Sequence, residues 1–480
     1  MQSRKEENSM KLQDLKINSI EIENFKNVEH GVVEFYFKDK VQNVVGLYGQ
    51  NGSGKTTIIE VLRVIDNLIA GNEMDEELLD MLEENKDGLA KISFLINKKN
   101  IVYYDVKIRK LQKQSNDDLN SSKSKETIEI VSENLSIKSL ENGGQPRTIV
   151  AYQIDEQNKI EFFPKYRFPQ TKINKTVFSL AVRESRDNLK SVIFGNVIKG
   201  YLSDTKNFDS DLREIYNILS TELTDNIFIF SNRINGLINA NMNFPIPLHF
   251  YLEESGQRAF GVLPLPTAKA AIITPLQLEI VKRVFDQINV VLPNIIPDLK
   301  IGIKELSKQL ADDGKEQLIV EVTSERGGKI IPFRSESDGI KKIVSILSSL
   351  INAYSSSKAI VAIDELDSGI YEFLLGELLE VLSKGARGQI VFTSHNLRPL
   401  EVLDKQNIIF TTVNPEQRYI RKNNIKKNNN LRDVYIRNIQ VGDGEDKLYN
   451  PTNTFEIQKS FRRAKNLRNR DKIKVGIVGD

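Results

Sequence analysis

The chain has 480 residues, of which 40% are hydrophobic and 28% charged, and its net charge is only +2. These values are typical of a globular protein with several domain-sized units, and they argue against a global affinity for nucleic acid. Cysteine is absent, which excludes disulfides and thiolate metal sites and fits a cytoplasmic location. Since no apolar stretch reaches the ~20 residues of a membrane span, we expect no membrane partner.

The first part of the chain is predicted to consist mainly of strands. Residues 1–14 are polar, and we expect them to be flexible. Alternating apolar residues predict a strand over 15–25 and its antiparallel partner over 32–37. A hairpin is predicted over 92–109, and strand character resumes over 127–137 after a polar loop.

A glycine-rich motif follows a short apolar run and opens a helix-like segment. It reads GQNGSGKT over 49–56, which is the pattern G-x-x-x-x-G-K-[ST] in a strand–turn–helix context. In such a P-loop, backbone N–H groups hold phosphate oxygens, Lys55 reaches the β- and γ-phosphates, and the Thr56 hydroxyl binds Mg²⁺. The motif therefore predicts a nucleoside triphosphate and Mg²⁺ as ligands, although it does not by itself distinguish an ATPase from a GTPase or a kinase. The expected nucleotide contacts are Gly49, Asn51, Gly52, Ser53, Gly54, Lys55, Thr56 and Thr57.

Two carboxylates follow a second predicted strand. The apolar run 359–363 ends at Asp364 and Glu365. Asp364 can hold Mg²⁺ through its waters, and Glu365 is placed to polarise a water for attack on the γ-phosphate. A later apolar strand ends at His395, which we interpret as a γ-phosphate sensor.

Other segments are less regular. Residues 195–300 begin with helical periodicity and continue with closely spaced prolines, so we predict a mostly helical but interrupted insertion. Two alternating runs over 318–333 meet at a Gly-Gly pair and predict a hairpin. Near the C-terminus, 454–468 predicts a basic amphipathic helix. The basic residues there are explained either by a solvated helix face or by contact with DNA or an acidic partner.

The order of these motifs resembles that of the ABC-type ATPases. The chain is similar to their RecF, SMC/Rad50 and OLD-like branch, which shares the N-terminal start IEIENFKN found here over 20–27. The resemblance implies an α/β fold: a P-loop NTPase head with N-terminal antiparallel strands, a mostly helical insertion and a basic C-terminal extension. The implied parts are a composite head over 15–194 and 301–430, the insertion 195–300, and the extension 431–480.

The resemblance also implies residue roles. Ser337 and Gly339 correspond to the ABC signature, although Glu336 stands where the family usually has Leu. Asp367 corresponds to the D-loop residue, and His395 to the switch histidine. The catalytic residues are then Glu365, Lys55 and His395, and the metal ligands are Thr56 and Asp364. The candidates for the Q-loop glutamine are Gln153 and Gln170.

In ATPases of this kind, two heads sandwich ATP, so the resemblance implies a homodimer or higher oligomer that turnover loosens. The implied function is DNA-related sensing or control of a separate effector, a nuclease or toxin, in anti-phage defence. A RecF-like clamp in DNA repair is the alternative. A single-chain OLD-like nuclease fits less well because only Asp443, Glu445 and Asp446 cluster near the C-terminus. A transporter energy subunit also fits less well, because those subunits are shorter.

Overall fold

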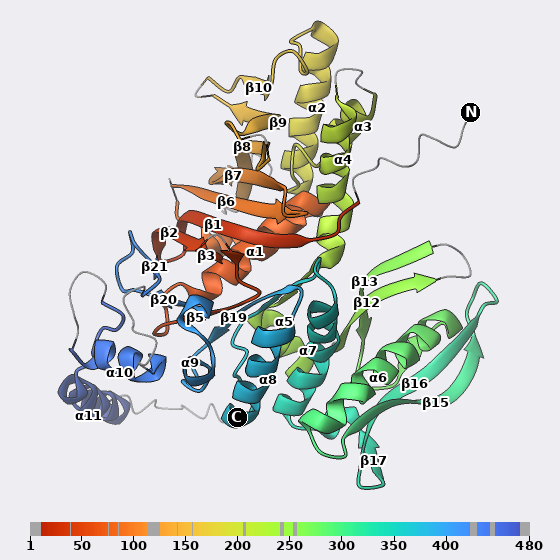
Figure 1. Ribbon diagram of the computed structural model, residues 1–480, viewed down its shortest axis with the longest axis vertical. Helices are drawn as coiled ribbons and strands as arrows, with labels where there is room; N and C mark the ends of the chain where they lie inside the picture. The colour runs from red at the N-terminus through yellow and green to blue at the C-terminus, as the bar shows by residue number, and fades with distance from the viewer. Residues whose placement is uncertain are drawn as a thin grey trace, which may run out of the picture.

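The computed structural model describes residues 11–38, 40–74, 76–84, 86–113, 125–141, 143–155, 157–204, 208–240, 244–252, 257–422, 430–441 and 447–470. Two sheets share a hydrophobic core with helix α1 (Lys55–Ala70), which lies between them (Figure 1). Residues 1–14 are predicted to be flexible, and residues 1–10 of this segment lie outside the described residues. The packed chain begins before residue 15, because Leu12 is buried and the Gln13 N–H donates to Asn97 at 2.7 Å.

The first sheet is antiparallel and forms the upper part of Figure 1. Its order is β10-β9-β8-β7-β6-β1-β2, and the predictions of a strand over 15–25, a hairpin over 92–109 and a strand over 127–137 are confirmed. The partner strand expected over 32–37 begins earlier, at residue 28, and ends at 34, where the chain leaves the sheet. The strands are β1 (Leu15–Phe25), β2 (Val28–Glu34), β6 (Asp87–Ile96), β7 (Asn100–Lys113), β8 (Lys125–Ser139), β9 (Arg147–Ile154) and β10 (Ile160–Phe163). A separate two-stranded pair contains β3 (Tyr36–Phe37) and β4 (Lys40–Val41).

The second sheet has the order β11-β18-β19-β5-β20-β21 and is parallel except for its last strand. Its strands are β5 (Val44–Tyr48), β11 (Ile227–Phe230), β18 (Ile360–Ile363), β19 (Gln389–Ser394), β20 (Ile408–Thr411) and β21 (Tyr419–Ile420). Alternate residues of β18 face opposite cores: Ile360 and Ala362 pack toward α1, whereas Val361 and Ile363 pack toward the helices on the other face. A parallel sheet covered on both faces explains the continuous apolar runs of these strands.

The segment 195–300 is more mixed than the mostly helical insertion that its sequence predicts. It contributes β11, which pairs with β18 and completes one side of the parallel sheet. The β branching and aromatic content of IFIF favour a strand once a neighbouring edge is available. Its other α-helices and strands are α3 (Asn196–Asp204), α4 (Ser210–Asn217), α5 (Asn232–Asn239), β12 (Phe244–Leu252), β13 (Gln257–Leu265), β14 (Ala271–Ile273) and α6 (Pro275–Ile295), and α2 (Lys172–Asn188) precedes them.

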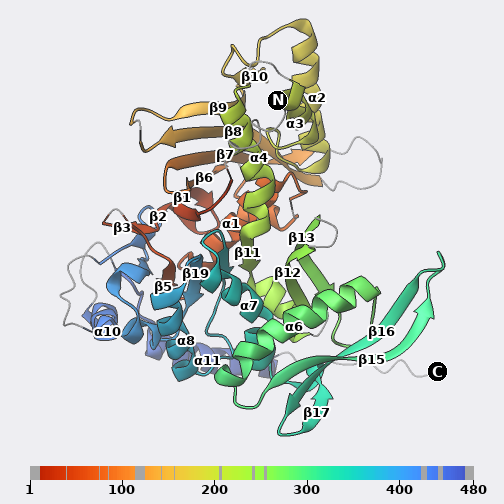
Figure 2. The ribbon, with the colours of Figure 1, turned by 45° about the vertical axis from the view of Figure 1, so that its right-hand side comes forward.

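A further sheet extends away from the head, as both ribbon views show (Figures 1 and 2). The hairpin expected over 318–333 is confirmed, and a preceding strand that the sequence analysis did not predict pairs with its first arm. These strands are β15 (Lys300–Leu310), β16 (Glu316–Arg326) and β17 (Lys329–Pro332). The remaining helices are α7 (Asp338–Ser355), α8 (Glu372–Gly385), α9 (Pro399–Val402), α10 (Leu431–Val441) and α11 (Thr454–Arg470). Among the described residues, no helix combines the length and apolarity that a membrane crossing requires.

Candidate nucleotide site

The predicted site residues converge at one edge of the parallel sheet. β5 leads into the P-loop, β18 ends before Asp364, and β19 ends before His395. The three strands are neighbours in the order β18-β19-β5, and they are parallel. Their carboxyl ends therefore open at the same edge, which is where ligands bind in sheets of this type. Residues separated by more than three hundred positions thus form one site.

The P-loop is tightly packed from behind and open at its tip. Gly54 has φ +90°, a conformation that favours glycine, and its carbonyl accepts a hydrogen bond from the Tyr419 hydroxyl at 2.7 Å. The Asn27 side chain donates to the carbonyl of Gly52, so the N-terminal start IEIENFKN touches the loop. The loop tip is exposed at Asn51 and Gly52. The other predicted contacts, Gly49, Ser53 and Thr57, are buried around the turn.

Lys55 lies in the loop with its ammonium group turned toward backbone oxygens. Its Nζ donates to the carbonyls of Gly49 at 2.9 Å and Gln50 at 3.0 Å. Burial lowers the pKa of Lys55 to about 8, and nearby carboxylates, with Asp364 first, oppose that shift. A buried ammonium with only carbonyl partners is suited to bind phosphate oxygens, because an anion would restore the favourable energy of its charged form.

The two predicted metal ligands lie side by side. The Thr56 hydroxyl donates to Asp364 Oδ1 at 3.1 Å, and the Thr393 hydroxyl donates to the same oxygen at 2.6 Å. Asp364 is fully buried, and burial raises the pKa of its carboxyl group. Two oxygens about 3 Å apart match neighbouring positions of an octahedral Mg²⁺ shell with ligands at ~2.1 Å. The pair therefore fits Mg²⁺.

Glu365 lies at a sharp turn directly after β18. Its φ of +47° is a strained conformation for a residue with a side chain, and such strain is often found at functional sites. Two contacts hold the turn: the Glu365 N–H donates to the Thr393 hydroxyl at 2.7 Å, and the Lys342 ammonium donates to the Glu365 carbonyl. Lys342 is 4% exposed, and burial lowers its pKa to about 8.

Asp367 and His395, predicted as the D-loop residue and the switch histidine, are directly connected. Asp367 Oδ2 accepts hydrogen bonds from the backbone N–H of His395 at 3.1 Å and of Asn396 at 3.0 Å. Partial desolvation lowers the pKa of His395 below 6.5, and the positive charge of Lys55 lowers it further. The imidazole is therefore mostly neutral at pH 7 and carries one N–H that can donate to an anion.

The residues predicted as the signature form the N-terminus of α7 and contact the predicted D-loop of the same chain. The Ser337 hydroxyl accepts a hydrogen bond from the Ile340 N–H at 3.4 Å, which caps the helix. Gly339 packs against Gly369 so closely that an added Cβ would lie 1.9 Å from the Gly369 carbonyl oxygen. Glu336, the departure from the usual Leu, accepts a hydrogen bond from the Ser324 hydroxyl at 2.6 Å. Glu336 therefore connects the predicted signature to β16 through this hydrogen bond.

Sequence reasoning missed Thr393 and Lys342 as part of this site. Two local signals could have indicated them. Thr393 stands directly before Ser-His at a strand end, and Lys342 is the third residue after Gly339. The two Q-loop candidates gain no support: Gln153 lies on β9 of the antiparallel sheet and Gln170 precedes α2. Among the described residues, no hydrogen bond joins either of them to the P-loop.

Comparison with known proteins agrees with this geometry. A family described as "AAA domain, putative AbiEii toxin, Type IV TA system" matches residues 44–401, which include the P-loop, the signature and the Asp-Glu strand. The chain belongs to this family. Its fold is that of an ABC-type ATPase head, as the order of the motifs implied. No curated protein matches the sequence.

Solved structures show a distant likeness. An SMC head bound to the C-winged helix domain of ScpA has 12% identity and a TM-score of 0.38, with 84% of this chain and 96% of that chain covered. The SMC head domain from Thermotoga maritima has 13% identity and a TM-score of 0.37, with 85% and 99% covered. At these values the likeness supports no statement about ligands or partners.

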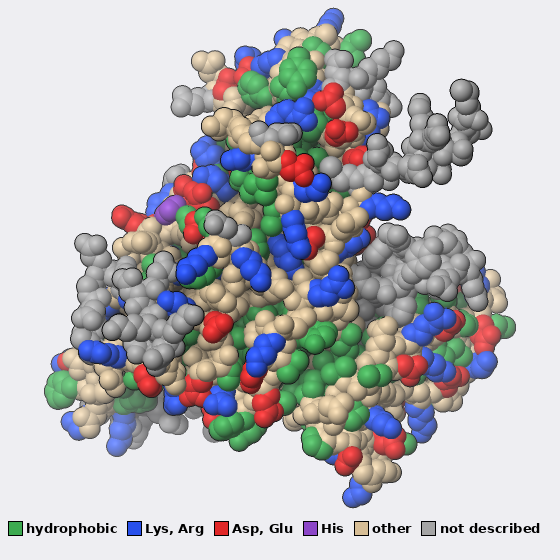
Figure 3. Space-filling view, in the orientation of Figure 1, with side chains coloured by type: hydrophobic (Ala, Val, Ile, Leu, Met, Phe, Trp, Pro, Cys, Tyr) green, Lys and Arg blue, Asp and Glu red, His purple; other side chains and the backbone are tan. Residues whose placement is uncertain are grey.

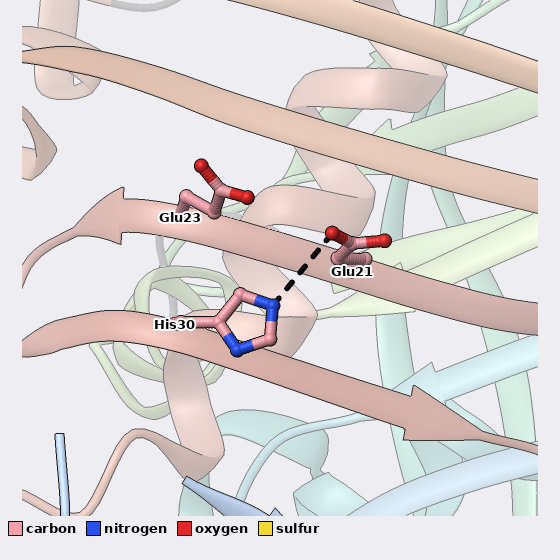
Figure 4. A group of neighbouring side chains, drawn as sticks. All are labelled: Glu21, Glu23 and His30. Carbon is pink, nitrogen blue, oxygen red and sulfur yellow. Dashed lines mark ion pairs between the residues drawn. The ribbon is translucent and has the colours of Figure 1, made fainter. Parts of the chain in front are cut away.

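A second polar cluster lies on β1 and β2 of the antiparallel sheet. Glu21, Glu23 and His30 offer ligand atoms within 4.8 Å of one another (Figure 4). The Glu21 carboxylate, however, already pairs with the Lys91 ammonium at 2.9 Å and with His30 at 3.7 Å. These contacts explain the cluster as surface ion pairs, so it does not compete with the P-loop edge as a functional site.

Proposed function

We propose that the chain binds Mg·ATP at the P-loop and hydrolyses it as a homodimer, in which each copy completes the nucleotide site of the other. The observation that carries the proposal is the convergence of Lys55, Thr56 and Asp364 at the carboxyl edge of the parallel sheet, with Glu365 held on the following turn. This arrangement supplies an anion-binding loop, a metal-ligand pair and a carboxylate for water activation.

In the proposed reaction, a water attacks the γ-phosphorus while the bond to the bridging oxygen of ADP breaks. The Glu365 carboxylate accepts the proton of the attacking water, and inorganic phosphate leaves. Bound Mg²⁺ would neutralise charge on the phosphates. Lys55 binds the phosphate oxygens through its ammonium group, and the neutral His395 imidazole donates its N–H to the γ-phosphate.

The exposed signature supports the homodimer. Ser337 is exposed at the N-terminus of α7, and among the described residues no hydrogen bond joins it to the P-loop of its own chain. A helix N-terminus pointing to solvent is a ready anion site for a second molecule. Next to the D-loop, Tyr371 and Phe373 form an exposed ring pair, 69% and 47% exposed and 5.7 Å apart. Aromatic side chains are enriched in protein interfaces.

Complementation between two inactive variants tests this arrangement. Lys55→Ala removes the P-loop ammonium, and Ser337→Arg blocks the signature, so each pure dimer has no working site. A mixed dimer keeps one site, formed by the intact P-loop of one chain and the intact signature of the other. If each site works independently, an equal mixture should recover about a quarter of wild-type ATPase activity. A mixture as inactive as its components would contradict the shared site.

We further propose that the dimer controls a separate effector, a nuclease or toxin, in anti-phage defence. The description of the matched family names a putative toxin of a type IV TA system, which supports a link to defence, whereas the separate effector is part of the proposal. Phage plating on cells that carry the gene with its neighbouring reading frames provides the test. Protection should disappear with Lys55→Ala. Protection that persists without the P-loop lysine would exclude an ATP-dependent defence role.

A DNA-repair clamp is the second candidate, and the exposed basic helix α11 favours it. Cells that lack the gene should then be sensitive to DNA damage in the absence of phage, and unchanged survival would exclude this role. The acidic cluster over 443–446, considered for a nuclease, lies outside the described residues.

A further inference from the structure

Helix α11 has an unusually exposed surface. All its described side chains are exposed except one that is partly exposed, and two of the exposed ones are large aromatic rings. Phe455 is 66% exposed and Phe461 is 75% exposed. Two strongly exposed aromatic rings on one polar helix make that helix a candidate binding surface, because aromatic side chains are enriched where proteins bind partners.

Cations lie beside these rings. In an α-helix, residues four and seven positions apart share a face, so Phe455 shares one with Lys459 and Arg462, and Phe461 shares one with Lys465. The only acidic residue of the helix, Glu456, pairs with Lys459 at 3.2 Å. By contrast, basic and acidic side chains are interspersed over the face of the molecule in Figure 3. Positive charge is therefore more concentrated on helix α11 than on the rest of the face that Figure 3 shows.

Aromatic rings interleaved with Lys and Arg match single-stranded nucleic acid. Its phosphates are complementary to the cations, and its unpaired bases stack on aromatic rings. Duplex DNA would satisfy the cations but leave the rings without a partner, because its bases are already stacked. An anionic membrane would favour one continuous apolar stripe. Here Phe455 and Phe461 lie about 120° apart around the helix, since six residues correspond to a rotation of about 600°, so the two rings do not share one stripe.

The chain just before α11 is attached to the P-loop. The Asn450 N–H donates to Gln50 Oε1, the second residue of the P-loop, at 2.7 Å. Two other contacts hold this segment on the head: Leu448 is 1% exposed, and the Lys447 carbonyl accepts from the Val413 N–H at 2.9 Å. Helix α11 begins at residue 454, only four residues after Asn450. A displacement of the P-loop tip thus reaches α11 through a very short link.

We propose that α11 binds single-stranded nucleic acid by base stacking and phosphate contacts, and that the Asn450–Gln50 hydrogen bond couples this binding to the nucleotide site. The coupling rests on the proposed ATPase function, whereas the binding itself does not. Each ligand then changes the affinity for the other by the same factor.

Binding is tested without nucleotide by the fluorescence anisotropy of labelled dT20 and rU20. Both should bind the full chain, and Phe455→Ala with Phe461→Ala should weaken binding about fivefold or more for each ring lost. Arg462→Glu with Arg463→Glu should reduce the slope of log affinity against log salt by about 1.4. The control, Lys172→Glu with Lys175→Glu, reverses two exposed lysines on α2 and should leave affinity within twofold.

Three results would overturn the binding proposal. One is the absence of dT20 and rU20 binding, and another is tight binding to a 20-base-pair duplex that the Phe variants do not weaken. The third is sedimentation with phosphatidylglycerol vesicles in preference to dT20 binding. Because these assays contain no ATP, they fail or succeed independently of the proposed hydrolysis.

Coupling is tested by substituting the donor of the hydrogen bond to Gln50. Asn450→Pro removes the backbone N–H, whereas the matched control Asn450→Ala keeps it. The wild type and Asn450→Ala should show a dT20 affinity that changes when Mg·ATP is added. Asn450→Pro should keep its nucleotide-free affinity and lose that change. As a second variant, a Gly-Ser insertion between Pro451 and Thr452 should weaken the coupling. Full coupling in both altered proteins would refute the proposed link.

Discussion

Gly339→Ala is expected to separate ATP binding from ATP turnover. Gly339 lies in the first turn of α7, where an added Cβ would approach the Gly369 carbonyl oxygen to 1.9 Å and its carbonyl carbon to 2.9 Å. Both neighbouring atoms belong to the backbone, so no side-chain rotation can relieve the contact. Either the N-terminus of α7 or the D-loop around Gly369 must move by about 1 Å or more, at a cost of roughly 1–3 kcal/mol.

In the proposed mechanism the displaced elements serve turnover, whereas the P-loop keeps its contacts. Asp367 precedes Gly369 by two residues and holds the backbone of His395, so a shift of the D-loop moves the histidine as well. A displacement of about 1 Å at a reacting group costs on the order of a hundredfold in rate. Steady-state ATPase assays should therefore show kcat reduced at least tenfold, and calorimetric titration should show an ATP Kd within twofold of wild type.

Gly200→Ala is the matched control, because an added Cβ there would meet no atom within 4 Å. It should leave both quantities unchanged and slightly stabilise α3. Normal turnover in Gly339→Ala would refute the idea that contact between the signature and the D-loop positions the reacting groups. Lost ATP binding with a lowered Tm would instead show that the contact holds the head together.

Three other changes test the site. Burial lowers the pKa of Lys55 to about 8, so most copies lose the ammonium charge by pH 9. ATP affinity should therefore fall about tenfold between pH 7 and pH 9. An ATP affinity that stays constant over this pH range would contradict the prediction. Lys342→Met should reduce kcat tenfold or more with little effect on ATP Kd, while its buried neighbour Lys341→Met, the control, should keep kcat within twofold. Thr393→Val removes the hydrogen bond to Asp364 of the metal pair and the one from the Glu365 N–H, and it should raise the Mg²⁺ concentration for half-maximal activity several-fold. An unchanged Mg²⁺ curve would argue against this role.

Much of the site could be predicted from the sequence because its chemistry is local. The P-loop is a continuous motif whose glycines, lysine and threonine are set by the shape of a phosphate. Asp364, Glu365 and His395 directly follow apolar strands, and parallel strands that end at one edge bring such residues together. The order of the motifs then implied the ABC-type head, which the match to a family over 44–401 confirms.

The rest depends on contacts that sequence periodicity does not encode. Lys342 is one of two adjacent lysines, and only the packing of α7 against β18 distinguishes it as the partner of the Glu365 carbonyl. β11 reads as four apolar residues within a helical segment, and pairing with β18 determines its conformation. The Asn450–Gln50 hydrogen bond joins residues four hundred positions apart. Each of these features arises from tertiary context, which overrides or adds to local preference.

The shared nucleotide site is tested most directly by the molar mass of Glu365→Gln in saturating Mg·ATP. This substitution removes the proposed proton acceptor and keeps the binding residues, so ATP should remain bound and hold two copies together. Light scattering during size-exclusion chromatography should give twice the 54.7 kDa of one chain with Mg·ATP, and a smaller mass without nucleotide. A mass of 54.7 kDa in saturating Mg·ATP would contradict the account.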